Sequence, residues 1–291
     1  MSVHLWLGDE AIAQAAIDAG ISGVYAYPGT PSTEITEYIQ QSPEAIARRV
    51  RSQWSCNEKT AMEAALGMSF AGKRAMVCMK HVGVNVAADP FINSAITGAH
   101  GGLVLAVADD PSMHSSQNEQ DSRFYGQFAL VPIFEPSSQQ EAYDMVLEAF
   151  DVSERHAVPV MVRITTRLAH SRADVTRRVE KPRDQNALRL HHDPQRYVLL
   201  PAIARRNYAE LLGKTAKFVE DAERSPFNVY EDGADRRLGI VACGIAVNYL
   251  NEVFGEERCP YPVLKIGRYP MPRRAIAKLM EQCESVLVLE D

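Results

Sequence analysis

Short apolar runs alternate with helix-forming segments through the first half of the chain. The apolar runs predict strands at 24–27, 74–79, 103–107, 131–134 and 158–164. Between them, helices are predicted to begin near Ser32 or Thr33 and to span 57–71, 84–97 and 139–154. Because strand–helix–strand repeats build parallel sheets covered on both faces, we predict an α/β fold with a doubly wound, mostly parallel sheet.

The alternation stops between Thr165 and Pro201, in the most basic part of the chain. The basic residues of this segment are Arg167, Arg172, Arg177, Arg178, Lys181, Arg183, Arg189 and Arg196. Aromatic side chains that stack on bases are nearly absent here. The pattern therefore favours a charged connector that wraps a neighbouring domain over a nucleic-acid surface. A helix is predicted at 202–222, and a polar loop follows it.

A second, smaller unit is predicted to begin near Arg237. Strands at 238–242, 263–266 and 286–289 alternate with helices at 245–254 and 272–283, which indicates a small open α/β sheet. We therefore divide the chain into a domain at 1–180, a basic connector and helix at 181–236, and a small domain at 237–291. The last strand stops almost at Asp291, so we expect the native chain to continue there or to dock on a partner.

The composition is ordinary for a globular protein, with 46% hydrophobic and 23% charged residues and a formal net charge of −6. This charge does not favour a nucleic-acid partner. No apolar run approaches the roughly 20 residues that cross a bilayer, and the start lacks the pattern of a secretory signal, so a cytoplasmic protein is expected. The five cysteines form no Cys-x-x-Cys pair and are predicted to be reduced and buried.

Three loops are predicted at the carboxyl ends of parallel strands, where open sheets of this class bind ligands. The first has the sequence YPGTPSTE and spans 27–34. The hydroxyl groups of Thr30, Ser32 and Thr33 stand beside a helix start and suit a carboxylate ligand. A turn followed by a helix N-cap explains the same residues without a ligand, so both interpretations stay open.

The second loop, Ser55-Cys56-Asn57-Glu58, precedes an alanine-rich helix. Ser-x-x-Glu is the capping-box pattern, which explains Glu58 without any catalytic role. A carboxylate at a domain edge can also stay partly neutral and share a proton with a heterocyclic nitrogen. The residues by themselves favour the cap and leave the second interpretation open.

The third loop runs from Met79 to Asn85 and contains Lys80 and His81. A solvated loop end is the simpler interpretation, since an isolated histidine is usually structural, and contact with a ligand or cofactor is the alternative. Asp109 and Asp110 follow the next strand. Two neighbouring acidic residues without further ligands are weak evidence for a metal ion, and we predict no metal site in this chain.

Taken in order, these loops resemble the alpha subunit of indolepyruvate:ferredoxin oxidoreductase, a member of the thiamine-diphosphate-dependent 2-oxoacid:ferredoxin oxidoreductase family. The matching stretches are YPGTPSTEI at 27–35, NEKTAMEAALGMSFAGKRAMVCMKHVGVNVAADP at 57–90, and GGLVLAVADDPSMHSSQNEQDSRFYG at 101–126. The resemblance is strong over about the first 180 residues, which correspond to the pyrimidine-binding domain. It continues loosely through 238–291, which is similar to a transketolase C-terminal-type domain.

The resemblance implies roles for individual residues. Glu58 matches the catalytic glutamate that hydrogen-bonds N1′ of the aminopyrimidine and favours the imino tautomer, whose nitrogen takes the proton from thiazolium C2. Thr30 matches a threonine that faces the carboxylate of the substrate, and Arg123 is expected to help hold an acidic substrate. The residues expected to border the cofactor are Gly29, Pro31, Lys80, His81 and Asn85.

The sequence also departs from the family pattern. The Gly-Asp-Gly stretch and later asparagine that bind magnesium and the diphosphate are missing; the nearest approach is Glu231-Asp232-Gly233, in a polar loop with no preceding strand predicted. The ferredoxin-like segment with its cysteine clusters is missing too. The chain alone is therefore expected to bind thiamine diphosphate poorly and to turn over nothing. It is expected to be a fragment, or a split subunit completed by a second chain.

The function that the resemblance implies is oxidative decarboxylation of an aryl pyruvate, such as indolepyruvate, to an acyl-CoA. The expected partners are the 2-oxoacid, a pyrophosphate-binding domain or subunit that holds Mg²⁺, and ferredoxin, within a homo- or hetero-oligomer. An iron–sulfur cluster and coenzyme A are expected only in the complete enzyme. The alternatives are a non-oxidative 2-oxoacid decarboxylase, an E1-type dehydrogenase subunit, and a non-catalytic assembly or binding module.

Overall fold

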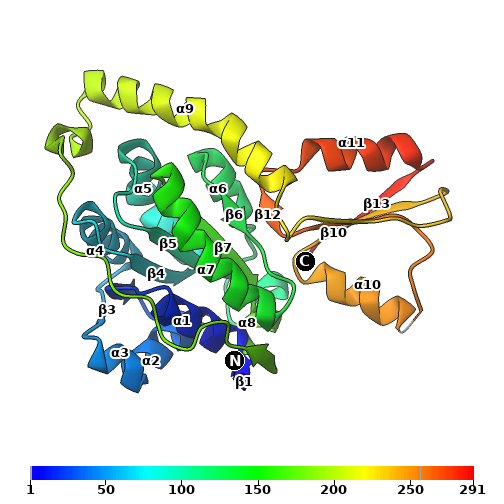
Figure 1. Ribbon diagram of the computed structural model, residues 1–291, viewed down its shortest axis with the longest axis horizontal. Coiled ribbons are helices and arrows are strands. Elements are labelled where there is room, and N and C mark those ends of the chain that lie inside the picture. The colour runs from blue at the N-terminus through cyan, green and yellow to red at the C-terminus, as the bar shows by residue number, and fades with distance from the viewer. Residues whose placement is uncertain (1, 256) are drawn as a thin grey trace.

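Sheets of seven, four and two strands organise the computed structural model, which describes residues 2–255 and 257–291 (Figure 1). The larger sheet has seven strands, in the order β12 (Arg268–Tyr269), β6 (Ile133–Phe134), β7 (Val160–Thr165), β5 (Leu103–Asp109), β4 (Ala75–Lys80), β2 (Gly23–Ala26) and β3 (Arg51–Trp54). All its strand pairs are parallel except β12 with β6. The predicted doubly wound, mostly parallel sheet is confirmed.

Helices cover both faces of this sheet because its strands are apolar on both sides. All seven residues of β5 are buried, as its continuous apolar sequence predicts. Alternate residues of β5 enter opposite cores: Val104 and Ala106 join one cluster, and Leu103 and Leu105 join the other. The first core contains α1 (Gly8–Asp18), α2 (Thr33–Gln41), α3 (Pro43–Ala47), α7 (Gln139–His156) and α8 (Thr166–His170). The second contains α4 (Glu58–Phe70), α5 (His81–Thr97), α6 (Arg123–Ala129) and α9 (Pro201–Glu223).

The basic segment after the larger sheet contains a strand that we did not predict. β8 (Arg172–Thr176) pairs antiparallel with β1 (Val3–Leu7) in a small separate sheet. Its partner lies at the other end of the domain sequence, so the local pattern does not reveal the pairing. The chain then runs over the first unit, where the Arg183 amide donates to the Asp18 carbonyl and the Arg189 amide to the Ala71 carbonyl. The segment therefore packs on the first unit and contains regular structure that was not predicted, and its role as a connector stays a prediction.

The smaller sheet has the order β13 (Val286–Leu289), β10 (Gly239–Cys243), β11 (Val263–Ile266) and β9 (Val229–Glu231). The first three strands, all predicted, are parallel, and α10 (Ala246–Phe254) and α11 (Arg273–Gln282) accompany them. β9 adds an antiparallel edge strand within the segment that was predicted to be a polar loop. The domain boundaries themselves stay a prediction.

The two units share a sheet at one point. Two residues of the C-terminal unit form β12, which pairs antiparallel with β6 of the first unit. Asn228 holds β12 in place: its side-chain oxygen accepts hydrogen bonds from the Gly267 and Arg268 amides, both at 2.9 Å. The chain ends between the two units, and α9 passes from one to the other (Figure 1). The short helices η1 (Pro111–Met113) and η2 (Pro194–Tyr197) complete the elements of residues 2–255 and 257–291.

The cysteines are all unpaired, as predicted, but only Cys78 and Cys243 are buried; Cys56 is exposed and the other two are half-buried. Among the helices of the described residues, none has both the length and the apolar character needed to cross a membrane.

Candidate functional site

The carboxyl ends of four adjacent parallel strands meet at one edge of the larger sheet. In its order β5-β4-β2-β3, each strand runs directly into one of the loops singled out in the sequence. The register aligns these ends, since Ala26 of β2 pairs with both Cys78 of β4 and Trp54 of β3. The expectation that the loops gather at one edge of the sheet is confirmed.

The loop after β2 uses two of its hydroxyl groups to close its own turn. The Gly29 amide donates to Thr33 Oγ1 at 2.9 Å, and Ser32 Oγ donates to the Gly29 carbonyl at 2.9 Å. The turn-and-cap interpretation therefore accounts for Ser32 and Thr33. Thr30 is exposed, and its hydroxyl has no hydrogen-bond partner among the described residues. The peptide bond between Thr30 and Pro31 is cis, and Pro31 is buried.

Glu58 is the first residue of α4, and it does not form the predicted capping box. The Asn57 side chain caps the helix instead, accepting from the Thr60 amide at 2.9 Å. Ser55 is too early in the chain for this role, because its amide still bonds to the Ala26 carbonyl at the end of β2. Glu58 is only 9% exposed, and its carboxylate has no hydrogen-bond partner among the described residues. The cap therefore leaves this acceptor free.

A glycine in the first turn of α5 makes room for Glu58. A β-carbon placed on Gly83 would lie 2.7 Å from both Cγ and Oε1 of Glu58, closer than such atoms approach. The absence of a side chain at Gly83 therefore sets the position of the carboxylate against α5. We did not single out Gly83 from the sequence, because the helix was predicted to begin at residue 84 and Gly83 was expected to lie in the loop before it.

The three residues predicted in the third loop occupy different positions. The Lys80 stem lies against Gly29, and its Nζ donates to the Ser115 carbonyl at 3.2 Å. His81 is fully buried, with Nε2 3.0 Å from the Asn118 carbonyl and Nδ1 without a partner. Asn85 accepts a hydrogen bond from the Tyr125 hydroxyl. The predicted third loop is therefore the end of β4 and the first turns of α5, and both are held against the segment that follows β5.

Asp110 organises that segment. Its carboxylate accepts from the Ser115 amide and Ser116 Oγ, both at 2.8 Å, from Thr166 Oγ1 at 2.7 Å and from the His114 amide at 3.2 Å. Burial raises the pKa of this carboxyl, but the hydrogen bonds outweigh burial and hold the pKa well below its usual value. Ser115 Oγ in turn donates to the Thr30 carbonyl at 3.3 Å. Through Ser115, Asp110 therefore helps to hold the YPGTP loop in place.

Asp109 has a different role from its neighbour. Its Oδ2 accepts from Arg163 Nε at 2.8 Å and from the Ser122 amide at 3.0 Å. A carboxylate paired with a buried arginine is poorly suited to hold a cation.

Arg123 lies between the two units. It forms ion pairs with Asp121 at 2.7 Å and with Glu290 at 2.8 Å, and its NH1 donates to the Tyr269 hydroxyl at 3.2 Å. Burial disfavours its charge, but the carboxylates of Asp121 and Glu135 outweigh burial and hold its pKa above its usual value. The predicted role of Arg123 in substrate binding stays a prediction, and the guanidinium already has protein partners.

The Glu231-Asp232-Gly233 stretch follows a strand, which corrects our expectation. That strand, β9, is an antiparallel edge strand of the smaller sheet. The Asp232 carboxylate accepts from Arg236 at 2.7 Å and from the Gly233 amide at 3.1 Å. These residues stand at the end of β9 in the smaller sheet, whereas Glu58 begins α4 beside the larger sheet. They resemble an ordinary charged turn.

Comparison with known proteins identifies the family. Residues 14–206 match the family described as pyruvate flavodoxin/ferredoxin oxidoreductase, thiamine diP-bdg. The chain belongs to this family. It is 44% identical to the indolepyruvate oxidoreductase subunit IorA of Archaeoglobus fulgidus, over 98% of this chain and 46% of that protein. It is 40% identical to the subunit of the same name from Methanothermobacter thermautotrophicus, over the same shares of the two chains. The chain thus spans about half the length of the curated relatives it matches.

A solved structure supports the fold. The 2-oxoglutarate:ferredoxin oxidoreductase from Magnetococcus marinus, with 2-oxoglutarate, coenzyme A and succinyl-CoA bound, superposes with a TM-score of 0.75 at 15% sequence identity. The match covers 98% of this chain and 57% of that one. The sheets of the chain therefore belong to a fold seen in this class of enzyme.

The residues around Glu58 fit an aminopyrimidine ring. The carboxylate offers a free acceptor for a protonated ring nitrogen. A cavity of about 590 Å³ lies elsewhere, between α6, α9 and β12, and it does not include Glu58.

Proposed function

We propose that this chain supplies the aminopyrimidine-activating half of a thiamine diphosphate site in a 2-oxoacid:ferredoxin oxidoreductase. The observation that carries the proposal is the free, nearly buried carboxylate of Glu58 at the head of α4, held against Gly83 of α5. Membership of a thiamine-diphosphate-binding family supports the choice of cofactor. Thiamine diphosphate, when bound, supplies the electron sink that decarboxylation of a 2-oxoacid needs.

The residues of this chain have three tasks in the proposal. Glu58 shares its proton with the pyrimidine nitrogen, since a carboxylate shielded from water and free of other donors interacts strongly with a single partner. Gly83 fixes the position of that carboxylate. Thr30, exposed on the YPGTP loop, donates its hydroxyl to the carboxylate of the substrate, and Gly29, Pro31, Lys80, His81 and Asn85 shape the border of the site.

We propose an aryl pyruvate, such as indolepyruvate, as the substrate, with oxidation to an acyl-CoA. The support is the name that the relatives at 40–44% identity carry. A pyrophosphate-binding domain or subunit is proposed to hold Mg²⁺ and the diphosphate, and the complete oligomeric enzyme to use an iron–sulfur cluster, coenzyme A and ferredoxin. The expected cytoplasmic location stays a prediction.

Reconstitution tests this proposal. The chain is combined with a partner that carries the Gly-Asp-Gly magnesium element, and indolepyruvate-dependent reduction of ferredoxin is measured. Activity should appear only in the mixture, and Glu58→Ala should lower it by about 100-fold or more, the usual contribution of a positioned acid–base group. Glu63→Ala, an exposed carboxylate on the same helix, should leave it unchanged. Full activity of the Glu58→Ala mixture would refute the role of Glu58.

Product analysis of the same mixture separates the proposed reaction from its alternatives. Acyl-CoA together with reduced ferredoxin supports the oxidoreductase. An aldehyde indicates a non-oxidative decarboxylase, and acyl-CoA without ferredoxin reduction indicates a dehydrogenase of the E1 type. Comparing indolepyruvate with phenylpyruvate and a branched-chain 2-oxoacid tests the preference for an aryl substrate, which equal kcat/KM values would contradict.

A further inference from the structure

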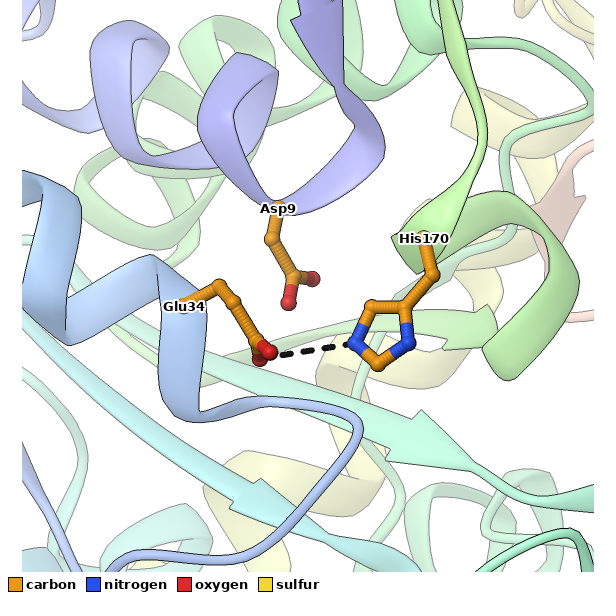
Figure 2. A group of neighbouring side chains, drawn as sticks. All are labelled: Asp9, Glu34 and His170. Carbon is orange, nitrogen blue, oxygen red and sulfur yellow. Dashed lines mark ion pairs between the residues drawn. The ribbon is translucent and has the colours of Figure 1, made fainter.

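Two carboxylates and an imidazole converge at a place that the proposed function does not use. Figure 2 shows Asp9 at the start of α1 and Glu34 at the start of α2, both directed toward His170 at the end of α8. Each of the three offers one ligand atom, and these atoms all lie within 4.8 Å of one another. Residues far apart in the sequence are thus brought together by the fold.

The Asp9 carboxylate is fully buried and lacks any donor. Neither of its oxygens has a hydrogen-bond partner, and the facing Glu34 Oε2 also has none. Among the described residues, no lysine or arginine side chain approaches either carboxylate within 4.0 Å. Burial, followed by repulsion from Glu34, raises the pKa of Asp9 well above its usual value. Two acceptors face each other, and a positive charge between them would satisfy both.

The surroundings leave an opening for such a charge. The side chains of Glu34 and His170 are 35% and 33% exposed, and His170 Nε2 lies 3.4 Å from Glu34 Oε2. This separation suits two ligands of one small cation, whose bonds to nitrogen and oxygen are roughly 2.0–2.2 Å long. Water has access from the side of these two residues and can fill the remaining coordination positions.

We propose that Asp9, Glu34 and His170 bind a divalent first-row transition cation of the zinc or manganese type. An imidazole beside two carboxylates favours such ions over magnesium and calcium, which prefer oxygen ligands alone. The buried carboxylate supplies the charge, and the two partly exposed ligands supply the entry path. This inference does not depend on the proposed function.

The cation would link three elements beneath the YPGTP loop. It joins the start of α1, the start of α2 and the end of α8. Glu34 directly follows Thr33, whose hydroxyl accepts from the Gly29 amide and closes the turn. Binding would therefore hold the base of that loop in place and raise the stability of the chain.

Titration of the metal-free chain with Zn²⁺ and Mn²⁺ tests the site. Calorimetry measures the binding of Zn²⁺, and electron paramagnetic resonance measures the binding of Mn²⁺. Cysteine thiols bind Mn²⁺ poorly, so the manganese signal reports on the proposed site and not on the cysteines. One ion should bind per chain, with release of protons and a rise in Tm. His170→Ala and Glu34→Gln should each weaken binding by at least ten-fold. Glu37→Gln on the same helix and His192→Ala, both exposed, should bind as the wild type does.

Circular dichroism of each variant without metal checks that it is folded, and the exposure of Glu34 and His170 favours this outcome. Equal affinity in the wild type, His170→Ala and Glu34→Gln would overturn the proposal. So would the absence of binding at millimolar metal, since the two carboxyl groups would then share a proton instead. A loss of affinity in the two ligand variants together with unchanged controls supports the site.

Discussion

Single residues decide most of the chemistry in this chain, and the sequence revealed only some of them. Glu58 was correctly placed at the head of a helix, but its capping box was wrong because Asn57 caps α4. Asp9 escaped notice altogether. Nothing in a local pattern tells a buried, unpartnered carboxylate from a solvated one at a helix start, since both follow the same preference for acidic residues in the first turn.

Asp9→Asn should stabilise the metal-free chain. Folding raises the pKa of Asp9, so the contribution of this group to stability is fully present below the ordinary carboxyl pKa near 4 and is lost as the pH rises through the raised value. An amide in its place carries no charge and can donate to Glu34. At neutral pH we expect a gain of about 1–3 kcal/mol in the free energy of unfolding.

Urea unfolding in EDTA, repeated between about pH 4 and pH 8, measures this effect. The difference between Asp9→Asn and the wild type should shrink toward the acidic end of the range. A variant no more stable than the wild type at neutral pH would show that the buried carboxylate is neutralised in another way.

At the scale of elements, the strands that the sequence did not predict all pair with a distant part of the chain. The strands and helices of the larger sheet that carry strong apolar patterns were placed within a few residues, because burial on both faces imposes those patterns. β1, β3, β8, β9 and β12 were missed. Each is at most five residues long and depends on a partner from a distant part of the chain, so its local sequence carries little signal.

The contact between α4 and α5 positions the candidate catalytic group, and Gly83→Ala should disturb it. The new methyl group would meet Glu58 at 2.7 Å and displace its carboxylate. We expect reconstituted activity to fall by about ten-fold or more, the scale of effect that a misplacement of about 1 Å produces. The fold should persist, since alanine is the better helix former.

Gly67→Ala on α4 is the matched control, because a β-carbon there meets nothing within 4 Å. It should leave activity unchanged and stabilise the chain by up to about 1 kcal/mol. Equal activities of Gly83→Ala and the wild type would show that the position of Glu58 does not depend on this contact.

For the molecule as a whole, buried charge holds the two units together. Arg163, which is only 2% exposed, bonds to Asp109 at 2.8 Å, to Glu135, and to the Asp291 carbonyl at 2.8 Å. Arg163 therefore links the larger sheet to the last residue of the chain. The sequence predicted two units, but the contact between them depends on side chains of widely separated residues and was not predictable.

Arg163→Met should destabilise the chain strongly. Removing the guanidinium leaves the Asp109 and Glu135 carboxylates buried without their main cation, a change that typically costs about 3–5 kcal/mol. Arg178→Met breaks an exposed pair with Asp144 and should cost no more than about 1 kcal/mol. Equilibrium unfolding in urea compares the two variants, and similar losses would contradict the importance we assign to the buried network.

The exchange of the thiazolium C2 hydrogen with deuterium tests the central claim most directly. Proton NMR follows this exchange for thiamine diphosphate bound to the complex of the chain with its diphosphate-binding partner. Our account predicts that Glu58→Gln slows the exchange by about 100-fold or more, while Glu63→Gln keeps the wild-type rate. Exchange at the wild-type rate in the Glu58→Gln complex, with the cofactor still bound, would contradict the account.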